Sequence, residues 1–158
     1  MNIEIICIGT LKEPYLKEAQ AEYLKRLTPY CKVSVTELRE ARLPKDAGEA
    51  EEEAVRRSEG EALLAAAEKG YLFALDPRGK QQPSEKFAET IQNLALDGKS
   101  TLVFLIGGSL GLPDSVRGKA DKVLSFSEMT FPHQLMRIIL LEQLYRAQKI
   151  LRGEPYHK

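Results

Sequence analysis

Cysteine is scarce in this chain: its 158 residues contain only Cys7 and Cys31, each in an apolar stretch. Their separation does not match the spacing of zinc ligands, and a disulfide framework would need more cysteines. We therefore expect two buried thiols in a reducing compartment. The chain also has no net charge, because its 23 lysines and arginines balance 23 aspartates and glutamates. This balance argues against a polybasic protein whose whole surface binds nucleic acid, although it allows a local basic patch.

Segments that would direct the chain to a membrane or out of the cell are also missing. No apolar run approaches the roughly 18 residues that a membrane span requires. The opening residues, MNIEIIC, carry an acid and no basic region, so a secretory signal is not expected. No internal repeat and no Gly-, Ser- or Pro-rich linker divides the sequence. Since most domains hold about 100–200 residues, we expect one cytosolic domain over residues 1–158.

Apolar runs of strand length alternate with stretches of helical periodicity along the chain. The runs indicate strands at Ile3–Ile8, Lys32–Leu38, Tyr71–Leu75, Thr101–Ile106 and Lys122–Ser125. The periodic stretches indicate helices at Tyr15–Leu27, Ala47–Lys69, Ser84–Leu96, Pro113–Lys119 and Pro132–Leu151. This alternation predicts an α/β sandwich with a mainly parallel sheet. Ligands of such folds bind beyond the carboxyl ends of the strands, so we expect the site in the loops after Leu75, Ile106 and Ser125.

Turn-forming and capping residues set several of the expected boundaries. The turn sequence Asp76-Pro77-Arg78-Gly79 should end the third strand. Ser84 is the expected N-cap of the helix that follows, and Pro132 suits the first turn of the last helix. Gly48 and Gly60 are expected weak points in the long glutamate-rich helix.

The last predicted helix is apolar on every side. Its apolar residues are Leu135, Met136, Ile138, Ile139, Leu140, Leu141, Leu144, Tyr145, Ile150 and Leu151. A helix that is hydrophobic all round is buried all round. We expect one of its faces to cover the sheet and another to pack against a second copy of the chain, which predicts a homodimer.

Charge is unevenly distributed along the neutral chain. Residues 39–69 hold six basic and nine acidic side chains, a balance of 6 − 9 = −3. Residues 133–158 hold five lysines and arginines and two glutamates, a balance of 5 − 2 = +3. Either stretch is compatible with a solvated face, but the basic end adjoins the expected ligand loops. It is therefore a candidate contact for an anionic substrate.

The glycine-rich loop after the fourth strand has two interpretations. Gly107-Gly108-Ser109-Leu110-Gly111 matches the G-x-S-x-G pattern of a serine hydrolase, with Asp114 or Asp121 and His133 or His157 as possible partners. A hydrolase serine leads directly into a helix, whereas several residues separate this serine from the next one. Alternatively, the glycines let a ligand approach the backbone closely. Neither G-x-G-x-x-G nor a Walker A sequence is present, so a dinucleotide or triphosphate site is not indicated.

Three ordered motifs add to this pattern. They are FLIGGSLGL at residues 104–112, LSFSEMTFPHQ at 124–134, and EQLYRA at 142–147 followed by GEPYHK at 153–158. Together they resemble the RlmH (YbeA-like) family of SPOUT RNA methyltransferases. IGTLK at residues 8–12 and EYLKR at 22–26 fit as well, so the resemblance covers essentially the whole chain.

The resemblance implies a SPOUT-type parallel-sheet sandwich with a C-terminal trefoil knot, used as a homodimer. It implies methyl transfer from S-adenosylmethionine to N3 of a pseudouridine in large-subunit ribosomal RNA. The ribosome is then the partner, and neither a membrane nor a metal takes part. A neutral protein should act weakly on naked RNA and well on a structured, assembled ribosome.

The resemblance also assigns residues. The implied cofactor contacts, mostly through backbone, are Leu75, Gly107, Ser125, Phe126, Ser127, Glu128, Met129, Thr130 and Phe131. The implied catalytic residues are Tyr156, His157 and Arg146, because the acceptor imide must lose a proton and a histidine accepts one near neutral pH. The implied phosphate contacts are Arg137, Arg152 and Lys158.

Other interpretations of these residues stay open. Arg146 has Glu142 four residues earlier, at ion-pair spacing. His133 in the first turn of an apolar helix favours a structural hydrogen bond, and Asp76 is either a ribose contact or an ordinary turn residue. The chain as a whole is alternatively a ribosome-binding or assembly module without catalysis, which need not bind S-adenosylmethionine.

Overall fold

A five-stranded sheet forms the centre of the molecule in the computed structural model, which describes residues 1–157. The strands are β1 (Asn2–Ile8), β2 (Lys32–Leu38), β3 (Tyr71–Gln81), β4 (Thr101–Ile106) and β5 (Lys122–Ser125). Their order in the sheet is β2-β1-β4-β3-β5, and every neighbouring pair is parallel. The central strands β1 and β4 are almost continuously apolar, as expected of parallel strands covered on both faces.

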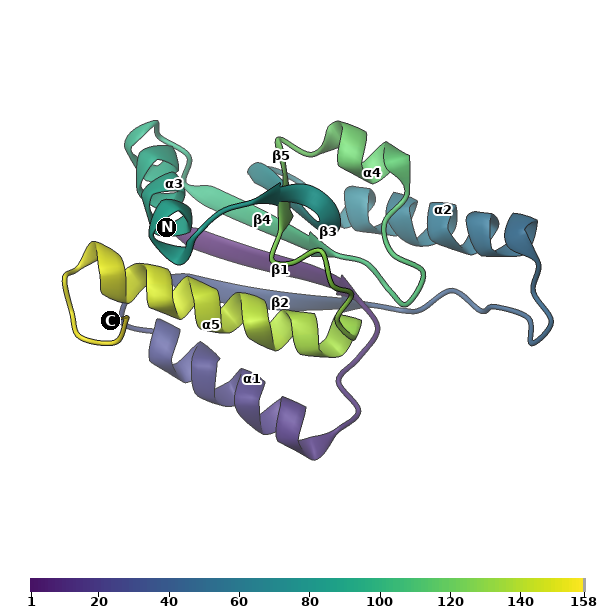
Figure 1. Ribbon diagram of the computed structural model, residues 1–158, viewed down its shortest axis with the longest axis horizontal. Coiled ribbons are helices and arrows are strands. Elements are labelled where there is room, and N and C mark those ends of the chain that lie inside the picture. The colour runs from purple at the N-terminus through teal and green to yellow at the C-terminus, as the bar shows by residue number, and fades with distance from the viewer. Residues whose placement is uncertain (158) are drawn as a thin grey trace.

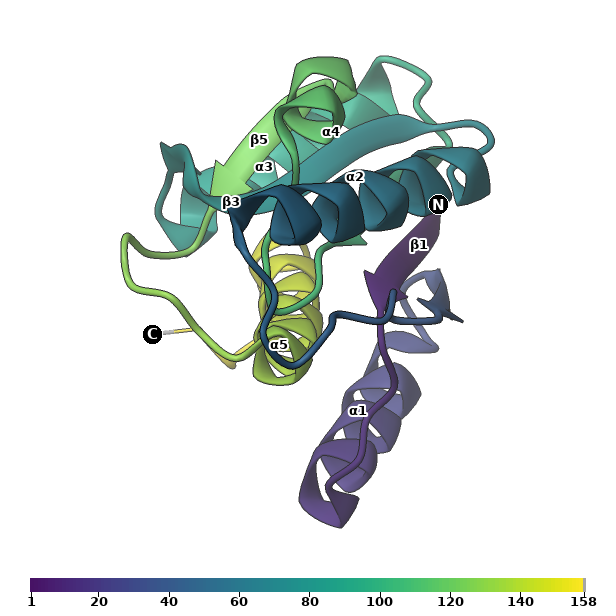
Figure 2. The same cartoon turned by 90° about the vertical axis from the view of Figure 1, so that its right-hand side faces the viewer.

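Five helices cover the two faces of this sheet. They are α1 (Pro14–Leu27), α2 (Glu49–Ala66), α3 (Ser84–Leu96), α4 (Asp114–Lys119) and α5 (His133–Leu151). Helices α1, α3 and α5 lie on one face, and α2 and α4 lie on the other (Figures 1 and 2). Among the described residues, none of these helices is long and apolar enough to cross a membrane.

The side chains of β1 divide between the two cores, because successive residues of a strand point to opposite faces. Ile5 and Cys7 pack with the α1, α3 and α5 layer, whereas Ile6 and Ile8 pack against α2 and α4. Both cysteines are free and buried, as expected, and burial raises the pKa of the Cys7 thiol to about 11. The prediction of two buried thiols is therefore confirmed.

All ten predicted elements are present, and most of their ends move by only a residue or two. The largest correction concerns Asp76–Gly79, which lie inside β3 and not beyond its end. Leu75 and Lys80 both pair with Leu124 of β5, so the intervening residues bulge out of the ladder. Gly79 is required there, since an added Cβ would lie 2.7 Å from the backbone of Val123.

Three smaller corrections have physical causes. Helix α2 begins after its N-cap Gly48 and ends at Ala66, short of the expected Lys69. Ser84 is not an N-cap, because its hydroxyl donates to Gln143 Oε1 at 2.7 Å and so ties α3 to α5. Gly60 does not weaken α2. Because it has no side chain, α2 can pack closely against Pro113 in the loop before α4.

Helix α5 is enclosed mainly by its own chain. It packs on the sheet between α1 and α3, which cover its two sides, as Figure 1 shows. The sheet, α1 and α3 therefore cover most of the apolar side chains around α5 without a second copy of the chain. Only Leu135, which is 38% exposed, presents a large apolar side chain of this helix to solvent. The homodimer and the trefoil knot stay predictions.

Candidate functional site

The three loops selected from the sequence line one cavity of about 680 Å³. They are the bulge of β3 after Leu75 and the loops at the carboxyl ends of β4 and β5, and the first turn of α5 closes the cavity through His133 and Met136. The cavity thus lies where the sequence predicted a site, and the site itself stays a prediction. The volume is typical of a cavity that holds a small molecule or cofactor. Within residues 1–157, no group of three or more His, Cys, Asp or Glu side chains is placed to hold a metal ion.

The glycine loop folds tightly upon itself at the edge of this cavity. The Gly111 amide donates to the Gly108 carbonyl at 3.0 Å, and Gly111 has a φ of +80°. A Cβ on Gly107 would lie 3.0 Å from the Gly111 carbonyl carbon and oxygen. Glycine is therefore needed for the turn itself, and the turn leaves its backbone open to a ligand.

The serine hydrolase interpretation is wrong on geometry. Ser109 is exposed in the turn and does not begin a helix, since α4 starts only at Asp114. In the part of the chain that the structure describes, no hydrogen bond joins Ser109 to a histidine. The four candidate partners are engaged elsewhere: Asp114 with Arg117, Asp121 with the Leu72 amide, His133 with Glu40, and His157 with Glu85.

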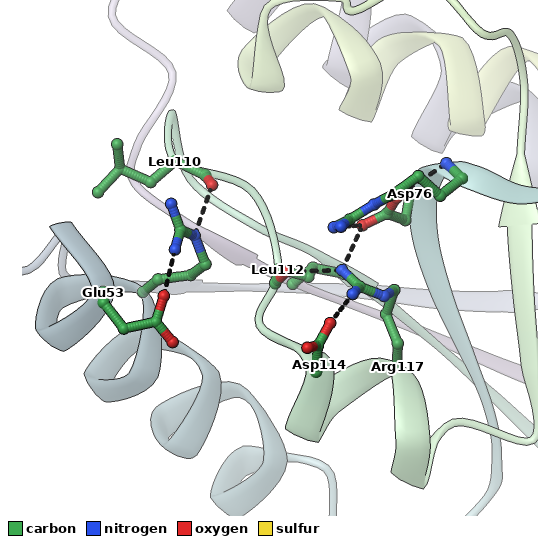
Figure 3. Close-up of polar contacts among 8 residues, drawn as sticks. Glu53, Asp76, Leu110, Leu112, Asp114 and Arg117 are labelled. Atoms are coloured by element: carbon green, nitrogen blue, oxygen red, sulfur yellow. Dashed lines mark hydrogen bonds and ion pairs between the residues drawn. The ribbon is translucent and has the colours of Figure 1, made fainter. Parts of the chain in front are cut away.

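Two arginines hold the glycine loop through its carbonyl oxygens. Arg56 of α2 donates through Nε to the Leu110 carbonyl at 3.0 Å. Arg117 of α4 donates through Nη1 to the Leu112 carbonyl at 3.1 Å and to Asp76 Oδ2 at 3.3 Å (Figure 3). The second arginine thus joins the loop after β4 to the bulge of β3. No sequence pattern points to Arg56, which lies 54 residues from its acceptor.

Asp76 is a buried carboxylate at the wall of the cavity, with only 5% of its surface exposed. It accepts hydrogen bonds from the Arg78 amide at 2.9 Å, Arg78 Nε at 3.0 Å and Arg78 Nη2 at 3.1 Å. Burial alone would raise the pKa of Asp76, but these bonds and the charge of Arg117 outweigh it and hold the pKa below its usual value. Asp76 therefore organises the bulge as a charged group.

Seven of the nine predicted cofactor residues line the cavity. These are Leu75, Gly107, Phe126, Ser127, Met129, Thr130 and Phe131. Ser125 and Glu128 are outside the lining. Ser125 is buried and donates to the Ser127 carbonyl at 2.9 Å, so it shapes the loop, whereas Glu128 is exposed. His133 adds a residue that the cofactor prediction missed, and its Nε2 lies 3.3 Å from Glu40 Oε1.

The predicted catalytic residues form one cluster around Glu142. Arg146 pairs with Glu142, as its spacing suggested, and the Tyr156 hydroxyl donates to Glu142 Oε1 at 3.1 Å. Arg146 Nη1 lies 3.1 Å from His157 Nδ1, and His157 Nε2 lies 2.7 Å from Glu85 Oε1. A guanidinium only donates, so Nδ1 is the acceptor and Nε2 carries the proton.

The cluster also fixes how two of its members are charged. Burial and the adjacent Glu142 charge raise the pKa of Tyr156 to about 12, so its phenol is a donor at neutral pH and not a base. The hydrogen bond to Glu142 raises the pKa of Arg146, which keeps its guanidinium positive. Of the three predicted catalytic side chains, only His157 has a lone pair that can accept a proton, and in this structure that lone pair, on Nδ1, accepts a hydrogen bond from Arg146.

The predicted phosphate contacts separate in the structure. Arg137 is 1% exposed, and its guanidinium donates to Glu37 Oε2 at 2.6 Å and to the Gly9 carbonyl at 3.1 Å. Because a buried, paired arginine cannot reach a phosphate, the structure does not support this prediction. Arg152 is exposed, with its guanidinium 4.7 Å from the centroid of the Tyr30 ring. Lys158 lies outside the described residues.

The catalytic cluster and the cavity lie apart within one chain. Met136 is the last cavity residue of α5, and Arg146 follows ten residues later, about 15 Å along the helix axis. Figure 1 shows the end of the chain beside the C-terminal end of α5, away from the loop that leads into this helix. The predicted catalytic residues therefore do not line the cavity of their own chain.

Comparisons with known proteins show the family of this chain. The family described as Predicted SPOUT methyltransferase matches residues 1–157. Ribosomal RNA large subunit methyltransferase H from Clostridium novyi (strain NT) is 55% identical over 159 aligned residues, covering 100% of both chains. The protein of the same name from Bacillus cytotoxicus is 54% identical over the same extent. A solved probable methylase family protein from Haemophilus influenzae Rd KW20 shares the fold, with a TM-score of 0.56 and 16% identity over 99% of this chain and 70% of its own. The chain therefore belongs to the SPOUT methyltransferase family.

Proposed function

We propose that this protein transfers a methyl group from S-adenosylmethionine to N3 of a pseudouridine in large-subunit ribosomal RNA. The observation that carries the proposal is the cavity formed by the bulge of β3 and the loops at the carboxyl ends of β4 and β5. It occurs in a chain 55% identical, over its full length, to a protein named as a ribosomal RNA large subunit methyltransferase. We further propose that the protein acts in the cytoplasm on assembled ribosomes, because a neutral chain has little general attraction for RNA.

The residues of the cavity suit S-adenosylmethionine. Gly107 and Gly108 present backbone without side chains, and Leu75, Phe126 and Met129 supply apolar surface for an adenine ring. These residues would hold the cofactor mainly through backbone and packing contacts. When bound, S-adenosylmethionine supplies an electrophilic methyl group on a sulfonium sulfur.

The tail cluster suits the other half of the reaction. The N3–H of a pseudouridine is weakly acidic, so a neighbouring group must accept its proton. We assign this role to His157 Nδ1, whose lone pair accepts from Arg146 in this structure and would become available when the Arg146 guanidinium turns toward the base. Arg146 would stabilise the negative charge that develops on the base, and the Tyr156 phenol would donate a hydrogen bond to the base or stack on it. Arg152 and Lys158 would hold phosphates.

A homodimer would bring the two halves together. In a two-fold dimer with antiparallel α5 helices, the C-terminal end of one α5 lies near the N-terminal end of the other. The tail of one protomer would then complete the cavity of its partner. The separation of about 15 Å within one chain supports this composite site, because reacting atoms must approach to about 3–3.5 Å.

Methylation of ribosomes tests the proposal directly. Purified protein and methyl-labelled S-adenosylmethionine are incubated with ribosomes that lack the modification, and mass spectrometry of the ribosomal RNA locates the product. We expect label in N3-methylpseudouridine of the large subunit, with less transfer to naked RNA. Deletion of residues 156–158 should abolish transfer and leave cofactor binding largely intact, whereas Ser109→Ala should behave as wild type. Absence of transfer to every ribosomal particle would contradict the proposal.

Calorimetry separates the enzyme from a non-catalytic assembly module. An enzyme that uses this cavity binds S-adenosylmethionine, and a module that keeps only the fold need not. Binding to ribosomes without measurable affinity for the cofactor would favour the module.

A further inference from the structure

A second cavity, of about 690 Å³, lies far from the first, where β1 and β2 begin. The end of α1 and the turn into β2 form it, with Lys25, Thr28, Tyr30 and Lys32 among its lining residues. We call this cavity the α1–β2 groove. Two of the ten residues that line it are lysines and none is acidic. Within residues 1–157, neither Lys25 nor Lys32 forms an ion pair, and both are exposed.

Further cations surround the aromatic wall of the groove. The Arg152 guanidinium lies 4.7 Å and Lys149 Nζ 5.6 Å from the centroid of the Tyr30 ring. The acid here is Glu154, which accepts from the Tyr30 hydroxyl at 2.5 Å and from Lys149 Nζ at 2.6 Å. The negative charge of Glu154 is thus balanced by Lys149. The positive charges of Lys25, Lys32 and Arg152 are left unbalanced around the groove.

The groove connects to the catalytic cluster through a row of aromatic rings. Tyr30 packs edge-on against Tyr145 at 6.1 Å between centroids, and Tyr145 packs edge-on against Tyr156 at 4.8 Å. Tyr156 and His157 are the residues assigned above to the acceptor base. A strand held in the groove therefore continues directly toward the groups that act on its base.

We propose that the α1–β2 groove binds the phosphate backbone of the ribosomal RNA beside the target nucleotide. The inference rests on the proposed function and extends it from the reacting base to the RNA that flanks it. Unpaired lysines without an acidic neighbour are complementary to phosphates, which position RNA without reading its sequence. In the composite dimer, each groove would lie beside the partner's cofactor cavity, next to its own tail. This local patch explains how a chain with no net charge holds a polyanion.

Charge reversal in the groove tests this inference. The variant is Lys25→Glu with Lys32→Glu, and the matched control is Lys69→Glu with Lys119→Glu, two exposed lysines on the α2 and α4 side of the sheet. We expect the groove variant to raise the KM for ribosomes at least tenfold, with kcat within about twofold and cofactor affinity unchanged. The slope of log(kcat/KM) against log salt concentration should become shallower by about 1.4–1.8, because two phosphate contacts are lost. The control should match wild type.

Two further measurements make the result decisive. Lys25→Arg with Lys32→Arg should restore the wild-type KM, since it restores the charge. Sedimentation with large subunits in the absence of S-adenosylmethionine measures binding alone, so the groove is tested even if no methyl is transferred. An unchanged KM, salt dependence and subunit affinity in the reversed variant would overturn the inference while leaving the methyltransferase proposal intact. Crosslinks from the groove to a ribosomal protein in place of RNA would also overturn it.

Discussion

At the scale of single residues, long-range polar contacts organise the cofactor cavity. The sequence pattern identified the glycine loop and the apolar residues around it, because these signals are local. It did not identify Arg56 or the link between Arg117 and Asp76, which arise only when distant segments fold together. Burial likewise removed Arg137 from the predicted RNA contacts, although its charge alone had suggested a phosphate ligand.

Arg56→Gln tests the role of the loop carbonyl contact. Loss of the charge-assisted bond to Leu110 should loosen the glycine loop and weaken S-adenosylmethionine binding about fivefold, equivalent to roughly 1 kcal/mol. Arg57→Gln is the control, since Arg57 is the neighbouring exposed arginine on α2. Titration calorimetry measures both variants. Equal affinities would show that the loop holds its shape without Arg56.

Asp76→Asn tests the buried carboxylate. A carboxylate whose pKa is lowered by folding stabilises the protein above the pKa of the unfolded chain, about 3.9, and this stabilisation is lost as the pH falls through the lower folded pKa. We expect the substitution to cost about 1–3 kcal/mol of unfolding free energy at pH 7. In urea titrations, the gap to wild type should narrow below about pH 4. A gap that is the same at pH 3 would contradict the assignment of a charged Asp76.

At the scale of elements, hydrophobic periodicity located every helix and strand, because burial of one face imposes it. It misplaced the end of β3, since the bulge at Asp76–Gly79 depends on the register with β5. It did not predict that α1 and α3 lie beside α5 and cover its two sides, because that is a matter of tertiary arrangement. The same holds for glycines inside helices, because their effect on stability depends on what packs against them.

Gly60 and Gly118 are helical glycines in different surroundings, so replacing each by alanine tests this dependence on packing. A Cβ on Gly60 of α2 would lie 2.5 Å from Pro113 Cγ, whereas one on Gly118 of α4 meets nothing within 4 Å. Gly60→Ala should therefore destabilise the protein by about 1–3 kcal/mol through overpacking. Gly118→Ala should stabilise it by about 0.4–1 kcal/mol, because it restricts the unfolded chain. Thermal unfolding of the two variants measures both changes in stability. Stabilisation by Gly60→Ala would contradict the packing account.

At the scale of the whole molecule, the separation between cavity and tail is the main consequence of the fold. None of the predicted catalytic residues lines the cavity of its own chain, and the proposed composite site accounts for this separation through a second copy. The neutral total charge conceals a basic C-terminal region, which lies beside the α1–β2 groove. Residue counts showed that the C-terminal region is basic, and only the fold placed that region beside the α1–β2 groove.

Leu135→Glu tests the dimer that this separation requires. Leu135 is the exposed leucine of α5, and a carboxylate there should prevent a second copy from packing against the helix. We expect a folded monomer in sedimentation velocity and loss of methyl transfer. Leu96→Glu, at the exposed end of α3, should remain dimeric and active. A monomer that retains transfer would show that one chain suffices.

The most direct test of the composite site mixes two inactive variants. One lacks residues 156–158 and keeps its cavity; the other carries Gly107→Val, which crowds the Gly111 backbone, and keeps its tail. A mixed dimer joins the intact cavity of the first to the intact tail of the second. After equal mixing and subunit exchange, half of the dimers are mixed and each has one working site, so transfer to ribosomes should recover to roughly a quarter of the wild-type rate. If mixed dimers form but remain as inactive as either variant alone, each chain must use its own tail, and the composite site is wrong.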